Sequence, residues 1–263
     1  MRVRKLFLSK QDKLFAVWRL LRLLIITVPI VIIGNQVCNL FNLDFSYGPI
    51  AKLIFIAGII LVTIYLDKEK IQDLGIVFKW RTIAYFIIGI IWAYFFNIQF
   101  QIISLIKSEN AFHFISPLTK DTLSSLIYYI VFIGLSEELM FRGYIISTIQ
   151  RDSNYLVALI VSAILFSLIH MGSGESIMNI FIMGTVMTLF FGLIFIMTRN
   201  IFLVVGLHGA WNAFERLFHE FFKQANMWPH TKMIVVIINL IIFYFLFRKP
   251  LHFELKSLIK HRP

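Results

Sequence analysis

Two adjacent glutamates interrupt an apolar run in the stretch GLSEELMFRGYI, residues 134–145. Arg142 follows Glu138 by four residues, and the apolar sequence continues on both sides, as LSSLIYYIVFI before the stretch and ISTI after it. A charge at the centre of a membrane span costs about 2.5–3.5 kcal/mol on insertion scales, so such residues normally face the protein interior or a water-filled cavity. The stretch therefore predicts a membrane helix that carries a buried charge cluster.

The composition supports a membrane protein. Of the 263 residues 59% are hydrophobic and 15% are charged, whereas soluble domains average about 25% charged residues. The formal net charge of +11 lies mainly at the two ends and in one loop. That distribution is typical of cytoplasmic loops and anionic headgroups, and we expect no nucleic-acid partner. A single cysteine, Cys38, excludes an intramolecular disulfide framework.

The hydrophobic pattern predicts an all-α polytopic membrane bundle of about eight transmembrane helices, because lipid offers no partners to backbone polar groups. The predicted spans are about 20–41, 50–66, 82–106, 124–149, 155–171, 176–198, 201–221 and 231–247.

Lysine and arginine alternate between successive loops as the positive-inside rule requires. The richer set is Arg2, Arg4, Lys5, Lys10, Lys13, Lys68, Lys70, Lys79, Arg81, Arg151, Arg199, Arg248, Lys249, Lys256, Lys260 and Arg262. The loop after the third span holds only Lys107 and Lys120, and the loop after the first holds none. We therefore expect a multi-pass protein of the cell membrane with both termini in the cytoplasm.

The three charged residues of the stretch 134–145 lie on two faces of the predicted helix. Glu138 and Arg142 are spaced i, i+4, so they share a helix face and can pair. Glu137 points about 100° away from Glu138 and is left for another partner. In the alternative interpretation, all three form an ion cluster that only holds helices together.

Two further polar sites lie deep in predicted spans. His170 ends the segment AILFSLIHM, while His208 and Asn212 are spaced i, i+4 in VVGLHGAWNAF. Counted from the inner ends of their spans, Glu137 and His170 lie at similar depths, roughly 20 and 22 Å. His208 lies only about 10 Å deep, unless its helix begins deeper in the membrane.

These side chains suit the hydrolysis of an amide bond. A carboxylate and an imidazole can bind and deprotonate a water molecule, and a second histidine with an amide can stabilise an oxyanion. Alternatively, Glu137, His170 and His208 could bind a zinc ion as its ligands, although the HExxH spacing is absent. We favour a mechanism without a metal cofactor, because the amide of Asn212 is a poor zinc ligand and a good oxyanion donor.

The polar residues belong to three motifs that follow one another along the chain. EELMFR (137–142) fits EExxxR, FSLIH (166–170) fits FxxxH, and HGAWN (208–212) fits HxxxN/D. Together they resemble the CPBP family of intramembrane proteases, also called the CAAX protease and bacteriocin-processing (Abi) family. The resemblance covers about residues 122–218. It implies N-terminal membrane helices over 1–121, a catalytic core over 122–218, and a C-terminal transmembrane helix with a basic tail over 219–263.

The resemblance also implies roles. Glu137 corresponds to the catalytic base, His170 to its partner on the water, and His208 and Asn212 to the oxyanion stabilisers. Glu138 and Arg142 correspond to the supporting half of the first motif. The expected substrate is a membrane-associated peptide or a lipidated protein, and membrane lipids are the other expected partners.

Two other functions remain open. One is a non-catalytic bacteriocin-immunity or membrane scaffold protein with the same fold. The other is a transporter or proton relay, in which intramembrane glutamate and histidine are equally typical. Inverted repeats would favour the transporter, and the sequence shows no internal repeat.

Overall fold

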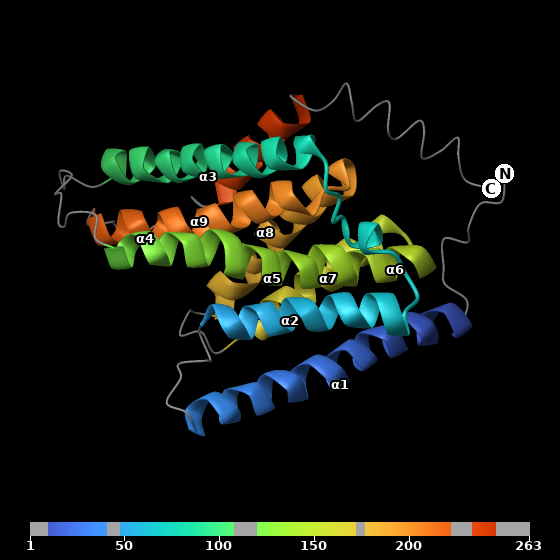
Figure 1. The fold of residues 1–263 in the computed structure, drawn as a ribbon. Coiled ribbons are helices and arrows are strands. Elements are labelled where there is room, and N and C mark those ends of the chain that lie inside the picture. Colours follow the sequence, from blue (N-terminus) through green and yellow to red (C-terminus); the bar gives the residue numbers. More distant parts are fainter. Residues whose placement is uncertain (1–9, 41–47, 108–119, 172–176, 222–232, 246–263) are drawn as a thin grey trace.

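The structure is a computed structural model that describes residues 10–40, 48–107, 120–171, 177–221 and 233–245 (Figure 1). In this part of the chain the regular elements are helices, with no strand, which confirms the predicted all-α class there. The elements are α1 (Lys10–Leu40), α2 (Pro49–Leu61), η1 (Val62–Leu66), η2 (Ile71–Leu74), α3 (Trp80–Lys107), α4 (Lys120–Ile127), η3 (Tyr128–Ile133), α5 (Gly134–Glu138), η4 (Leu139–Ile146), α6 (Ser147–Asp152), α7 (Tyr155–Ile169), α8 (Ile177–Thr198), α9 (Ile201–Phe221) and the helix Met233–Phe245.

Among the described residues, three helical stretches are long and apolar enough to cross a membrane: Pro49–Leu66, Trp80–Ile103 and Thr122–Arg151. Shorter apolar helices cover Tyr155–Ile169, Gly184–Thr198 and Met233–Phe245. These helices point to a membrane protein, while the count of eight spans stays a prediction. The basic residues 2–5 and 248–262 lie outside the described part of the chain.

Helix α3 illustrates how a span divides its two faces. Ile83, Ile87 and Ile91 recur every four residues, and each is about half exposed or more. Phe96 and Phe100 point inward and are buried in the core. A stripe of exposed isoleucines on a helix is the surface that lipid chains cover, so α3 separates lipid from core.

The motif-bearing helix differs from the expected uniform α-helix. From residue 120 to 152 the chain is helical throughout, but η3 and η4 are π-helical, with backbone bonds that reach five residues back instead of four. Glu138 is the last residue of α5, and Arg142 lies in the π-helical segment η4. Such wide turns occur frequently at functional sites.

Helix α9 lies at the centre of the bundle, in contact with α3, α4, α5 and α8 (Figure 1). Glycines allow its close approach to the motif-bearing helix. A Cβ atom on Gly134 would lie 2.8 Å from the Val205 oxygen, and one on Gly209 would lie 2.7 Å from the Ile130 Cα. Small residues at such interfaces are the usual way for membrane helices to pack tightly. The third motif, on α9, therefore packs closely against the helix that carries the first motif.

Candidate active site

Glu138 joins the first motif to the third. Its Oε1 atom lies 2.8 Å from Nη1 of Arg142, so the predicted pair is present. The same oxygen accepts a hydrogen bond from Nδ1 of His208 at 2.5 Å. The side chains of Glu138 and Arg142 are fully buried. Glu138 is therefore committed to two partners within the protein.

Glu137 is the more accessible of the two carboxylates. Its side chain is 19% exposed, against 0% for Glu138. Its Oε2 atom lies 3.8 Å from Nε2 of His208, at the opposite edge of the ring from the Glu138 contact. One imidazole thus stands between two adjacent glutamates, which face it from different directions because neighbouring residues diverge on a helix.

The depth of His208 is explained by where α9 begins. Ile201, its first residue, is fully buried, and its backbone N–H donates to the Gly75 carbonyl at 3.0 Å. The side chain of Asn200 caps the helix by accepting from the Phe202 N–H at 2.9 Å. Because the helix starts inside the protein, seven residues are enough to bring His208 level with Glu138.

His170 is the C-cap of α7. Its Nδ1 lies 2.8 Å from the Phe166 carbonyl oxygen. A carbonyl only accepts, so Nδ1 carries the proton, and Nε2 of the neutral ring is an acceptor. The imidazole also stacks on Phe166, with 4.3 Å between ring centroids and 28° between planes. Helix α7 packs against η4, beside Arg142.

An aromatic cluster surrounds the buried arginine. The Cζ atom of Arg142 lies 5.3 Å from the ring centroids of both Phe166 and Phe191. The His208 ring is 5.1 Å from Phe191 and 6.1 Å from Phe166. Both histidines therefore contact rings that also contact Arg142.

The structure thus brings together Glu137, Glu138, Arg142 and His208, and it connects His170 to them through Phe166. Asn212 is half-buried one turn beyond His208 on α9. Convergence of Glu137, His170, His208 and Asn212 on one cavity stays a prediction, as do their catalytic roles. Phe191 was missed at the sequence level, because it lies outside the three motifs in a chain with 28 phenylalanines.

The residues named as possible zinc ligands do not form a metal site in this arrangement. Within the described ranges, no three His, Cys, Asp or Glu side chains lie close enough together to hold an ion. Glu137, His170 and His208 are therefore not arranged as a three-ligand zinc set in this structure.

A second charged cluster ties the N-terminal helix to the other end of η4. The Asp67 carboxylate is fully buried, pairs with Arg22, and accepts from the Tyr144 hydroxyl at 2.7 Å. Glu69 pairs with Arg19 at 3.4 Å and with Arg151. These contacts hold α1 against the end of the motif-bearing helix.

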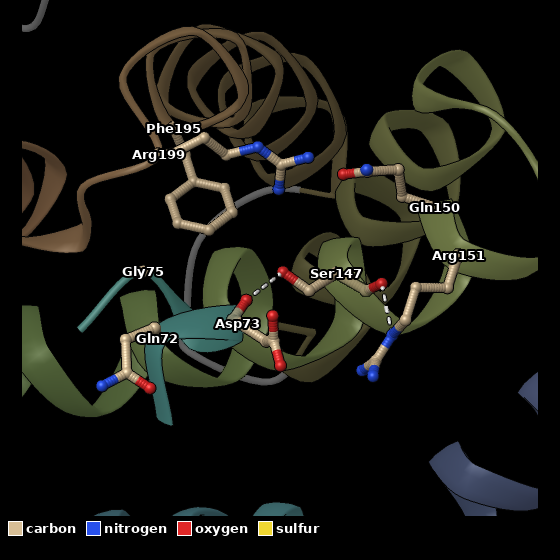
Figure 2. Close-up of a pocket in the computed structure, with 8 residues that line it drawn as sticks. All are labelled: Gln72, Asp73, Gly75, Ser147, Gln150, Arg151, Phe195 and Arg199. Atoms are coloured by element: carbon tan, nitrogen blue, oxygen red, sulfur yellow. Dashed lines mark hydrogen bonds between the residues drawn. The ribbon is translucent and has the colours of Figure 1, made fainter. Parts of the chain in front are cut away.

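Next to this cluster is a cavity of about 250 Å³ (Figure 2). Its walls are Gln72, Asp73, Gly75, Ser147, Gln150, Arg151, Phe195 and Arg199. The Ser147 hydroxyl donates to the Asp73 carbonyl at 2.9 Å, and Figure 2 marks this bond with a dashed line. None of the predicted catalytic residues lines it, so it is a different cavity from the one that the sequence predicts.

Comparison with known families adds to this geometry. Residues 119–214 match the family described as type II CAAX prenyl endopeptidase Rce1-like. The matched range contains all three motifs, from Glu137 to Asn212, and it confirms the resemblance to the CAAX proteases. A comparison with curated proteins gave no match.

Proposed function

From the match of residues 119–214 to the CAAX prenyl endopeptidases, we propose that this protein is an intramembrane endopeptidase in which Glu137 activates the water. Its substrate is a membrane-associated peptide or a lipidated protein. One observation carries the assignment of Glu137: Glu138 is buried and engaged by Arg142 and His208, while Glu137 is more exposed beside the same imidazole.

In the proposed reaction Glu137 takes a proton from a water molecule, whose oxygen attacks the carbonyl carbon of the scissile bond. The C–N bond of the tetrahedral intermediate then breaks, and Glu137 returns the proton to the leaving amine. His170 holds the water through Nε2, which accepts in the tautomer set by the Phe166 carbonyl. The products are a carboxylic acid and an amine, so no further reactant is required.

The oxyanion is stabilised from α9. The amide of Asn212 donates hydrogen bonds in any protonation state. His208 already donates its Nδ1 proton to Glu138, so its Nε2 donates to an oxyanion only when the ring is doubly protonated. Removing one donor of this kind typically lowers kcat by about 10²–10³-fold. We propose that Asn212 is the principal donor.

These side chains complete the proposed reaction without a metal ion. The test is elemental analysis of the purified active enzyme together with a chelator assay. Stoichiometric zinc, with activity lost to the chelator and restored by zinc, would contradict the proposal.

The experiment that tests the function uses the full chain in proteoliposomes. One substrate is a farnesylated peptide with a C-terminal CAAX sequence, and the other is the same peptide without the lipid. We expect wild-type protein to cleave the lipidated peptide, and Glu137→Gln to lower kcat at least about 100-fold, the typical contribution of a general base. Cleavage by Glu137→Gln at the wild-type rate, with Glu138→Gln inactive, would reverse the two roles.

Glu215 offers a matched control on α9. Its carboxylate accepts from Nε1 of Trp211 at 3.3 Å. Glu215 is partly buried, and Glu215→Gln keeps that acceptor with nearly the same side-chain volume, so it should leave kcat within about 2-fold. A well-folded wild-type protein that cleaves neither peptide would instead favour the non-catalytic alternative.

A further inference from the structure

The plane of the His208 ring is not set by its hydrogen bond alone. Nδ1 is bonded to Glu138 at 2.5 Å, and this fixes one atom of the imidazole. The ring can still turn about that contact, which would move Nε2 away from Glu137, now 3.8 Å from it. A second contact, on the face of the ring, is needed to hold its orientation.

Phe191 supplies that contact from α8. Its ring lies 5.1 Å from the His208 ring, with 29° between the planes, so the two stack. Phe191 is 1% exposed and His208 is 5% exposed, so neither ring has room to swing into solvent. Offset stacking at this separation is a favourable aromatic arrangement.

Arg142 in turn holds Phe191. The guanidinium carbon lies 5.3 Å from the Phe191 centroid, within cation–π range. In the described part of the chain, Nε and Nη2 of Arg142 have no hydrogen-bond partner. The guanidinium meets Glu138 and the rings of Phe191 and Phe166. One arginine therefore contacts both phenylalanines on which the two histidines stack.

We propose that Phe191, which lies outside the three motifs, is a positioning residue that fixes the ring plane of His208 and so directs Nε2 toward Glu137. This proposal rests on the proposed peptidase function. Its alternative is that Phe191 only fills the core. A displacement of about 1 Å in a catalytic group can cost about 10²-fold in rate, so loss of the stack should lower turnover far more than it lowers substrate binding.

Phe190 is a matched control for packing. It is the preceding residue on α8 and is fully buried. Its ring contacts Phe96 at 5.8 Å and Trp92 at 6.2 Å, on the side of α3. Leucine at either position removes a buried ring from the same helix, but only Phe191→Leu removes the stack on His208.

The kinetic test compares Phe191→Leu, Phe190→Leu and Phe191→Tyr in proteoliposomes. Phe191→Leu should lower kcat about 10- to 100-fold with KM within about 3-fold. Phe190→Leu should leave kcat within about 3-fold at a similar loss of thermal stability, and Phe191→Tyr, which keeps the ring, should restore most of the activity. Equal losses of kcat in the two leucine variants would overturn the proposal.

A second measurement separates this proposal from the peptidase function itself. In histidine-labelled protein the imidazole signal of His208, identified by its loss in His208→Gln, should carry a ring-current shift from Phe191. Phe191→Leu should abolish the shift and Phe190→Leu should preserve it. If the shift survives Phe191→Leu, the positioning role is wrong. If wild type cleaves no peptide, the function fails while the shift still decides the role of Phe191.

Discussion

At the scale of single residues, the carboxylates of the first motif are adjacent in sequence but chemically different. The Glu138 side chain is fully buried in contact with Arg142 and His208, whereas the Glu137 side chain is partly exposed. Removing one partner of a buried ion pair strongly destabilises a protein, because the remaining charge stays buried without an opposite charge. The difference in burial therefore separates a structural carboxylate from a candidate base.

The buried pair gives the first prediction. Glu138→Gln and Arg142→Met should each lower the free energy of unfolding by about 3–5 kcal/mol. The double variant should lose much less than the sum, because it leaves no unpaired charge. The measurement is reversible unfolding in mixed micelles, as a double-mutant cycle. Additive losses would show that the two side chains contribute independently.

At the scale of helices, the site depends on the close approach of α9 to the motif-bearing helix. Gly209 follows His208 directly, and a Cβ atom there would lie 2.7 Å from the Ile130 Cα and 2.8 Å from the Tyr129 oxygen. Both neighbours are backbone atoms, which cannot move aside without shifting a helix. The methyl group of alanine would therefore separate His208 from Glu138.

We predict that Gly209→Ala lowers stability by about 1–3 kcal/mol, the usual effect of overpacking. It should lower kcat about 100-fold, because the imidazole moves relative to Glu137. The control is Gly58→Ala on α2, where the new Cβ would meet only the Thr27 side chain, at an ordinary 3.4 Å. Peptide cleavage and thermal unfolding of both variants check the prediction. Normal turnover in Gly209→Ala would refute the close-packing argument.

The sequence predicted the all-α class and the Glu138–Arg142 pair, because hydrophobic runs and i, i+4 spacing are local signals. It could not predict the π-helical turns of η3 and η4 or the buried start of α9, because these depend on packing. The bond from Glu138 to His208 spans 70 residues, and no local pattern indicates which donor meets which carboxylate. Phe191 has no motif, and only its stacking on His208 identifies it.

At the scale of the whole molecule, the basic loops meet at one end. The cavity in Figure 2 is lined by Gln72, from the loop after the second predicted span, and by Arg151 and Arg199, from the loops after the fourth and sixth. Their meeting is what alternating orientation requires, because every second connection returns to the same side of the membrane. This supports the prediction that these three loops share one side of the membrane.

The topology is therefore our next prediction. A green fluorescent protein fused after residue 263 should fluoresce, since it folds to its fluorescent form in the cytoplasm. An alkaline phosphatase at the same place should be inactive. Inserted between residues 108 and 119, after the third predicted span, the two reporters should give the opposite result. The same result at both places would contradict the proposed orientation.

The link between Glu138 and His208 also has a consequence for biosynthesis. Membrane helices emerge from the ribosome in order, and a contact between distant residues cannot form until the later one has been made. A nascent chain that ends before α9 contains EELMFR and FSLIH but lacks the imidazole that Glu138 binds. The proposed hydrolytic centre is therefore completed only after α9 has been made. While the residues before α9 are being synthesised, the proposed protease lacks the His208 partner of Glu138 and cannot yet cleave a neighbouring peptide.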